Sequence, residues 1–271
     1  MIFRILILLI MYSSNFLFSQ EKMEKIIIKN LEKPFSNVNI SSFGGITLMQ
    51  GDSYKVIIEM EDQFKDLVKK KVKDNTLYLS LKNHDHKEVN SKAIIYTPQL
   101  SSVILDASGG LLLKDFHNQE KINIKTQSTG SLVVQNINCK RLDIRIDASG
   151  SFLIEGDKKI KKINAIINAV GNVTFNQKIG NLDLKLNSSN IAKITSKIDS
   201  AKMYLATTNF LNAEEAIIKE LDLDAHLVRD VKVFVKESLK INSSKVQKIE
   251  VDGNPKILSK KVDKQTEFKL L

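Results

Sequence analysis

The sequence predicts an all-β solenoid whose parallel coils each take about 20 residues, a length within the range of known repeat units. The main observation is a triplet of apolar, polar and apolar residues that recurs along the chain: Val103/Leu105, Ile122/Ile124, Leu142/Ile144, Ile163/Ala165, Leu182/Leu184, Ala201/Met203, Leu221/Leu223 and Leu239/Ile241. The position numbers of the first members increase in steps of 19, 20, 21, 19, 19, 20 and 18. Such a period indicates stacked β-coils, because one strand with its turn cannot bury its apolar face alone.

The second observation is the residue type at the corner after each triplet. The corner positions are Gly110, Gly130, Gly150, Gly171, Asn190 and Asn209. Glycine, and next asparagine, accept positive φ most readily, so a left-handed corner on every coil is expected. Arg229 stands at this position in the seventh unit, which is therefore expected to turn differently. The short polar residues before the corners are expected to form hydrogen-bonded ladders.

Residues 1–19 have the pattern of a secretory signal peptide. Arg4 is followed by an apolar run from Ile5 to Met11 and by small and polar residues up to Ser19. The apolar run is shorter than the roughly 20 residues that span a bilayer. Cleavage near Ser19 would release an extracytoplasmic chain without a transmembrane segment. The alternative is an uncleaved membrane anchor, since Leu17 is larger than the residue preferred at that position.

Residues 20–271 are expected to form a single elongated domain. Its N-terminal part, 20–100, holds strands and one short helix. That helix is expected over Glu61–Lys73, where apolar residues recur at helical spacing, and it would cap the open end of the solenoid. The segment Val38–Leu48 has the pattern of a coil, so the column is expected to begin near Val38. Regular coils occupy 101–258, and 259–271 form a C-terminal tail.

The chain is basic, with 41 Lys and Arg against 31 Asp and Glu. Its net charge is +10, and loss of Arg4 with the signal peptide leaves +9. The bases are mostly lysines spread along the chain, which favours a solvated coat that also blocks edge-to-edge strand pairing. Trp is absent and aromatic residues make up 6%, so no nucleic-acid partner is expected. The positive charge is compatible with anionic glycans or lipids as partners.

Few residues have the types that catalysis or metal binding needs. His84 and His86 share one face of an extended segment but lack a third ligand, so a solvated loop is favoured over a metal site. Cys139 is the only cysteine and is expected to fill space in the interior. Asp143, Asp183 and Asp222 are expected to face outward in one file, the most enzyme-like feature of the chain. The sequence assigns no catalytic, cofactor-binding or metal-binding residue.

Several short motifs together resemble the bacterial head-GIN family of auto-transporter adhesins. They are Gln50-Gly51-Asp52, Thr97-Pro98-Gln99-Leu100, the corners Ser108-Gly109-Gly110, Thr129-Gly130-Ser131 and Ser149-Gly150-Ser151, and Gly253-Asn254-Pro255. The resemblance covers nearly all of the mature chain. It implies an extracytoplasmic, right-handed β-helix-like fold and provides no catalytic residues. The chain departs from the family pattern at Asn190, Asn209 and Arg229, where glycines are expected.

We expect a non-enzymatic interaction module of the cell envelope that is adhesin-like and contacts a glycan, an envelope component or a protein through one face of the solenoid. One alternative is a polysaccharide-processing enzyme, since parallel β-helices can carry paired carboxylates. The other is a structural accessory protein for envelope stress. The sequence does not identify the partner, the face that it contacts or the oligomeric state.

Overall fold

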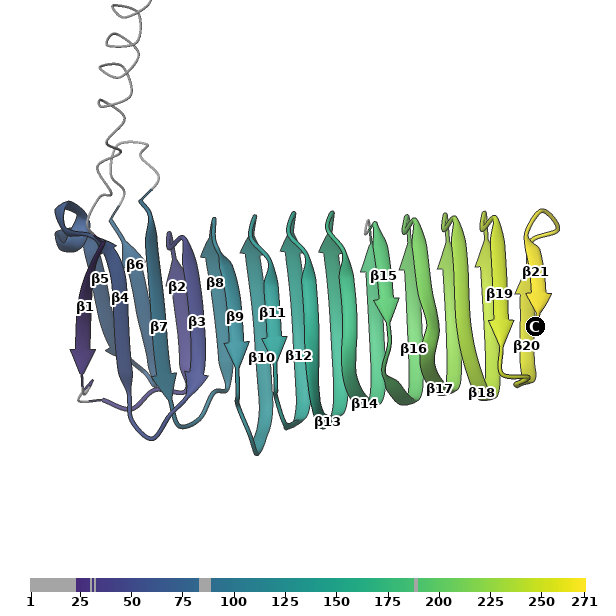
Figure 1. Cartoon of the computed structure of the whole chain (residues 1–271), viewed down its shortest axis with the longest axis horizontal. Helices are drawn as coiled ribbons and strands as arrows, with labels where there is room; N and C mark the ends of the chain where they lie inside the picture. The colour runs from purple at the N-terminus through teal and green to yellow at the C-terminus, as the bar shows by residue number, and fades with distance from the viewer. Residues whose placement is uncertain (1–22, 30, 32, 83–88, 188–189) are drawn as a thin grey trace, which may run out of the picture.

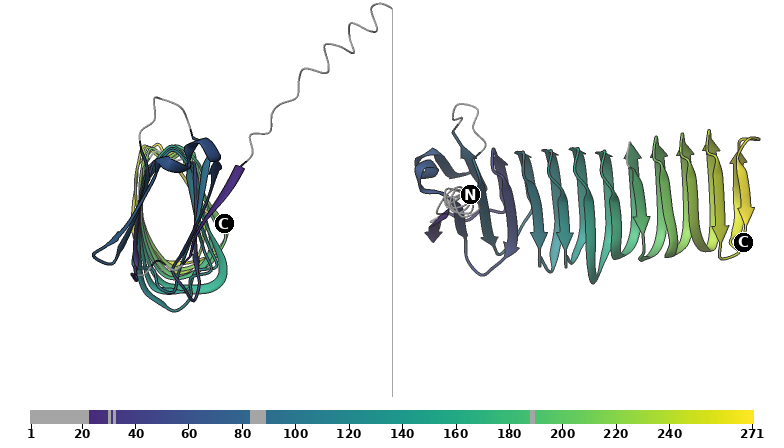
Figure 2. Two further views of the ribbon diagram at one scale, coloured as in Figure 1. Left: turned by 90° about the vertical axis from the view of Figure 1, so that its left-hand side faces the viewer. Right: turned by 45° about the horizontal axis from the view of Figure 1, so that its top comes forward.

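The computed structural model of the chain is a β-solenoid of about eight turns, which confirms the predicted fold class. It describes residues 23–29, 31, 33–82, 89–187 and 190–271. The expected signal peptide at 1–19 and the loop with His84 and His86 lie outside these residues. The coils stack side by side into a rod (Figure 1). Viewed along the rod, each coil is a flattened loop with two long faces (Figure 2).

We call the two long faces face A and face B. Four long strands run along face B, bend, and continue along face A: β13 (Phe152–Ala169), β14 (Val173–Asn187), β17 (Phe210–His226) and β18 (Asp230–Ser244). Face A also contains β5 (Val68–Lys73), β6 (Thr76–Leu81), β2 (Asn37–Ser41), β8 (Ser102–Ala107), β10 (Gln119–Ser128), β12 (Cys139–Ala148), β16 (Lys197–Ala206) and β20 (Lys256–Val262).

Face B also contains β1 (Met23–Lys29), β4 (Lys55–Glu61), β7 (Ser91–Thr97), β3 (Gly45–Gln50), β9 (Gly110–Lys114), β11 (Leu132–Gln135), β15 (Ile191–Ile194), β19 (Lys248–Asp252) and β21 (Glu267–Leu270). Neighbouring coils pair in parallel and in register. Residues 259–271, expected as a tail, include most of β20 and all of β21, which pair with β18 and β19.

The column begins before the clear repeats, as the segment Val38–Leu48 predicts. Strand β2 pairs in parallel with β8, and β3 with β9. Strand β2 also pairs with β6, so β6 and β7 form a coil on its other side. The chain therefore builds the β2/β3 coil first and then the outer β6/β7 coil. It returns past the β2/β3 coil to begin β8.

The predicted helix is shorter than expected and ends in a strand. Residues Asp62–Leu67 form a 3-10 helix, η1, whereas Val68–Lys73 form strand β5. Strand β5 pairs antiparallel with β6, and this pairing satisfies its backbone groups better than one further helical turn at the end of a sheet. The capping role stays a prediction, and the position of η1 agrees with it: η1 lies at the N-terminal end of the rod (Figure 1), and its Phe64 is buried in the core.

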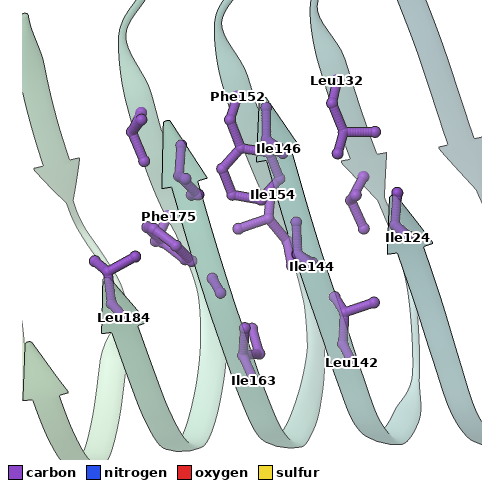
Figure 3. Close-up of a cluster of buried hydrophobic side chains, with 14 of the residues drawn as sticks. Ile124, Leu132, Leu142, Ile144, Ile146, Phe152, Ile154, Ile163, Phe175 and Leu184 are labelled. Atoms are coloured by element: carbon purple, nitrogen blue, oxygen red, sulfur yellow. The ribbon is translucent and has the colours of Figure 1, made fainter. Parts of the chain in front are cut away.

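Inward side chains from the two faces form one continuous apolar core (Figure 3). Ile144 of β12 lies between Ile124 and Ala165 of the adjacent coils, and its exposed fraction is 3%. On the core side of face B, the rings of Phe152 and Phe175 from adjacent coils meet edge to face with centroids 5.4 Å apart. Aromatic pairs of this kind contribute about 0.5–1.5 kcal/mol beyond their buried area.

One predicted register is wrong. Val103 pairs with Ile124 and Leu105 with Thr126, whereas the sequence pattern aligned Val103 with Ile122. The longer first step leaves room for the connection that carries Phe116, whose side chain is fully buried. The other steps between triplets agree with the structure.

The corner glycines are present where expected, but the reason predicted for them is wrong. None of Gly110, Gly130, Gly150 and Gly171 has positive φ, and neither has Asn190 or Asn209. The glycines stack so closely that a side chain has no room. A Cβ on Gly150 would lie 2.2 Å from the carbonyl oxygen of Gly130, and one on Gly130 would lie 2.4 Å from the backbone of Gly109.

Hydroxyl groups join these stacked corners, as expected. Ser128 Oγ donates to the carbonyl oxygen of Gly109 at 2.7 Å, and Thr129 Oγ1 donates to that of Ser108 at 2.8 Å. In the next coil Ser149 Oγ donates to the carbonyl oxygen of Thr129 at 3.3 Å. The ladder satisfies corner carbonyls that the strand ladders do not reach.

Later coils use a second kind of corner. Thr207, Leu227 and Lys245 have φ of 56°, 53° and 55°, and the residue after each is buried: Thr208, Val228 and Val246. The coil that holds Arg229 therefore turns differently from the glycine coils, as expected. These corners bury the residue after the positive-φ position, whereas glycine corners bury the residue two positions before the glycine, such as Ser128 and Ala169.

The end strands of face A each carry a lysine in an inward register. In β5, Lys70 pairs with the buried Leu79 and lies between Val68 and Val72. In β20, Lys260 pairs with the buried Ile241, and its Nζ lies 3.7 Å from the centre of the Phe268 ring. Inward charges of this kind discourage further strands from pairing with an edge.

Substitution of Gly150 by alanine should test the close stacking of the corners. We expect Gly150→Ala to lower the free energy of unfolding by about 3 kcal/mol, the upper range for overpacking, because the contact is with backbone. Gly45→Ala is the control, since its Cβ would meet only Lys92 Cγ at 3.8 Å. Guanidinium unfolding midpoints measure both. Equal midpoints for the two variants would contradict the stacking argument.

Candidate functional site

A shallow groove of about 550 Å³ runs along face A, parallel to the rod axis. Its floor is one outward column of short side chains that pair from coil to coil: Ser102, Asn123, Asp143, Asn164 and Asp183. Each successive floor residue is about 4.8 Å from the last, the spacing of paired strands. The floor is thus a regular series of hydroxyl, amide and carboxylate groups.

Longer side chains make the walls of the groove. One wall is the next outward column, with Ile104, Lys125, Arg145, Ile166 and Lys185. Arg141 stands on the opposite wall. The groove therefore follows from a column of short residues between columns of long ones. In the sixth coil the floor position is Lys202, which lines a second, smaller hollow of about 250 Å³ together with Tyr204 and Asp222.

Asp143 lies at the centre of a hydrogen-bonded network in the floor. Arg141 Nε lies 2.8 Å from its Oδ1, and Lys121 Nζ lies 3.0 Å from its Oδ2. Asn164 Nδ2 donates to Oδ1 at 2.5 Å. Partial burial opposes ionisation of Asp143, but the hydrogen bonds from Arg141, Asn164 and Lys121 outweigh it and lower the pKa of Asp143.

A second network lies beside the groove. Asn168 Nδ2 donates to Asp147 Oδ1 at 2.6 Å, and Arg145 Nε lies 3.1 Å from Asp147 Oδ2. The hydrogen bond from Asn168 is the main cause that lowers the pKa of Asp147, and partial burial works against it. Asn187 Nδ2 extends the ladder by donating to Asn168 Oδ1 at 2.6 Å. These contacts fix Arg145 beside the groove.

Two cations of the wall form no direct ion pair with a described carboxylate, although the charge of Lys125 contributes to the lowered pKa of Asp147. Within the described part of the chain, Lys125 and Lys185 make no ion pair within 4.0 Å. Both side chains are exposed, as is much of Ile104 and Ile166, whose exposed fractions are 42% and 37%. The wall thus exposes two ammonium groups and two apolar side chains to which a ligand can bind.

The expected file of Asp143, Asp183 and Asp222 exists, but other residues interrupt it. Asn164 stands between the first two and Lys202 between the last two. A general acid of a glycosidase needs a raised pKa, whereas the pKa of Asp143 is lowered by its partners. The file therefore suits hydrogen bonding to a ligand better than proton transfer.

The other candidate residues have structural roles or lie outside the described residues. Cys139 is buried, as a space-filling residue should be, and burial followed by the charge of Asp143 raises its pKa to about 12. Among residues 23–29, 31, 33–82, 89–187 and 190–271, no three His, Cys, Asp or Glu side chains gather into a metal site. No helix in the same ranges has the length and apolarity to cross a membrane.

Face B carries a different surface. An outward apolar column runs through Ile94, Leu112, Val133 and Leu153, and these side chains are half-buried. Beyond Thr174 the same column becomes polar, with Lys193, Asn212, Lys232 and Glu250. A hollow of about 370 Å³ lies over its N-terminal half. Thr47, between Ile94 and Leu112, is the polar member of this column as far as Leu153.

The family comparison agrees with the fold and the corner motifs. The model of the family described as "Putative auto-transporter adhesin, head GIN domain" matches residues 34–166 and 146–255. The chain belongs to this head-GIN family. A comparison with curated proteins gives no match.

Solved structures of three bacterial proteins have the same fold as this head-GIN chain. A "putative adhesin" from Parabacteroides distasonis is 14% identical, with a TM-score of 0.64 over 93% of this chain and 98% of the other. A "Putative lipid binding protein" from the same species has 14% identity and a TM-score of 0.60 over the same shares. A "putative adhesin" from Parabacteroides merdae has 12% identity and a TM-score of 0.59 over 93% and 97%.

The sequence pattern indicated the acidic file of this head-GIN chain but not the groove around it. The signal was present in the outward residues of the triplets, which alternate between short polar types and Lys, Arg or Ile. It becomes readable only when the columns are aligned in the correct register, including the longer step from Val103 to Ile124.

Substitution of Asp143 should show how the floor network contributes to stability. We expect Asp143→Asn to lower the free energy of unfolding by about 1 kcal/mol at pH 7, because three donors lose a charged acceptor. Because the pKa of Asp143 is lower in the folded protein than in the unfolded chain, ionised Asp143 stabilises the fold at pH values above its unfolded pKa, near 3.8. This contribution disappears as the pH falls through the folded pKa.

The difference between wild type and Asp143→Asn should therefore be full at pH 7 and should disappear as the pH falls below about 3.8 and through the lowered pKa of folded Asp143. Asp183→Asn is the control, because Asp183 in the same column has no ion pair within the described residues. Urea unfolding across this pH range measures the difference. A gap that persists at the lowest pH would contradict the assigned network.

Proposed function

We propose that the protein is a non-enzymatic, adhesin-like module of the bacterial envelope that binds its partner through the groove of face A. The observation that carries this proposal is the outward series of polar groups in the groove, in which Lys125 and Lys185 form no ion pair with any described residue. The core and the strand ladders do not need these side chains. Membership of a family described as adhesins supports a binding role.

An extracytoplasmic location is part of this proposal. It rests on the adhesin family and on the signal-peptide pattern of residues 1–19. After cleavage near Ser19, residues 20–271 would form the single domain that presents the groove. The long axis of the rod then gives the partner an extended contact, in contrast to the compact pocket of most small-molecule sites.

The alternative of a polysaccharide-processing enzyme has less support. The carboxylates that would act as acid and base are separated by Asn164 or Lys202, and Asp143 is held in its ionised form. The groove is also shallow, without loops that would exclude water from a reaction. A binding role uses the same residues without requiring a perturbed general acid.

Filling the floor of the groove should test the binding surface whatever the partner is. We expect Asn164→Tyr to weaken binding to isolated bacterial envelopes by about ten-fold, or about 1.4 kcal/mol, because its ring would occupy the floor. Thr174→Tyr is the matched control, an outward substitution on face B one coil away. Sedimentation with envelope fractions measures the bound share.

Circular dichroism and thermal unfolding would establish that both variants keep the fold. Undiminished envelope binding by Asn164→Tyr, or an equal loss with Thr174→Tyr, would show that the groove of face A is not the binding surface.

A further inference from the structure

We infer that the groove of face A binds a linear acidic polysaccharide, with its chain along the rod axis and its carboxylates on the lysine and arginine wall. This inference rests on the proposed function, since it names the ligand class of the same groove. It follows from the direction of the groove, the charge of its walls and the chemistry of its floor.

The direction of the groove favours a linear polymer that contacts side chains of the protein and not its backbone. The groove crosses the strands at right angles and is lined by side chains from five successive coils. The backbone groups of these coils are already paired with one another in the parallel ladders. An extended peptide therefore cannot join the sheet as another strand here. Its backbone would lie unpaired in the groove.

The walls carry more positive than negative charge. Lys125, Arg141, Arg145 and Lys185 line the groove, against the carboxylates of Asp143 and Asp183. Arg145 and Lys185 stand two coils apart in one column, roughly 9–10 Å from each other at the backbone. Because Lys125 and Lys185 have no ion pair in the described chain, an incoming anion would not have to displace an internal partner.

Two isoleucines stand among these cations in the same column. Ile104 precedes Lys125 and Arg145, and Ile166 lies between Arg145 and Lys185. A sugar ring has an apolar face of C–H groups as well as a rim of hydroxyl and carboxylate groups. Exposed isoleucines next to cations match both features, whereas a uniformly polar polymer would leave the isoleucines uncovered.

The floor separates acidic sugars from other polyanions. Asp143 and Asp183 accept hydrogen bonds from hydroxyl groups, while the amide of Asn123 can both donate and accept. Because the same carboxylates repel any anionic group on the floor, they favour a polymer that has neutral hydroxyl groups to place there while its charges lie against the wall, as an acidic polysaccharide does. Between Ser102 and Asp183 the lining holds no aromatic ring on which bases could stack.

Binding of oligogalacturonate to the purified full-length protein tests this inference. The matched ligand is the methyl-esterified oligomer, which keeps the sugar chain and removes its charge. We expect calorimetry at low salt to give at least about ten-fold tighter binding of the acidic form, and its affinity to fall as salt rises. Equal affinity for the two forms would overturn the inference.

A pair of variants places the binding on face A. We expect Lys125→Gln combined with Lys185→Gln to lose at least about ten-fold in affinity, while arginine at the same two positions retains binding. The control combines Lys92→Gln with Lys193→Gln, the same change of charge on face B. An equal loss in the control would show attraction to the whole lysine coat and overturn the inference.

Competitors distinguish the ligand class and separate this inference from the proposed function. Polyglutamate or single-stranded DNA that binds as tightly as oligogalacturonate would replace the polysaccharide with an acidic peptide or a nucleic acid. If Asn164→Tyr abolishes envelope binding but the wild type does not bind oligogalacturonate, the proposed function stands and the polysaccharide inference falls. If Asn164→Tyr leaves envelope binding unchanged, the proposed function itself falls.

Discussion

The in-register parallel ladder is the constraint on which the rest of this structure depends. Because equivalent residues lie one strand spacing apart, any property that recurs once per coil becomes a continuous column. The apolar residues of the triplets become a core, as Ile124, Ile144 and Ala165 show. The glycines become a stacked corner without room for a methyl group. The short polar residues become a groove floor.

This constraint also explains why the two faces differ although their strands are built alike. On face A, short residues separate long ones, so the outward surface is hollowed along the rod. On face B, the outward column from Ile94 to Leu153 is apolar except for Thr47 and then becomes polar. A change in side-chain length or polarity at one position per coil is therefore enough to create a new surface, with no change to the core.

Much of the fold could be predicted from the sequence because period and alternation are local signals. The columns from Leu142 to Ile241, the early start near Val38 and the outward file of aspartates follow from them. The extent of η1 could not be predicted, because the residues at Val68–Lys73 satisfy a helical spacing as well as the alternation of a strand. Pairing with β6 decides between them, and that contact is not local.

Two further features could not be predicted from the sequence: the reason for the corner glycines and the position of the groove. The physical cause differs from that for η1. Both depend on distances between coils, such as the approach of Gly150 to Gly130. The candidate site likewise depends on which residue of one coil stands beside which residue of the next. An error in register at Val103 moves a whole strand out of its column, so the walls cannot be assembled without the structure.

The lysines in the inward register of β5 and β20 have a consequence for the size of the molecule. A stack of coils has no intrinsic length limit, since each exposed coil is a template for the next, in the same way that an amyloid fibril grows at its tip. Lys70 and Lys260 place an ammonium group where an added coil would need an apolar side chain. Axial polymerisation would have to bury both charges, so the same ladder that builds the rod is prevented from extending it into a fibre.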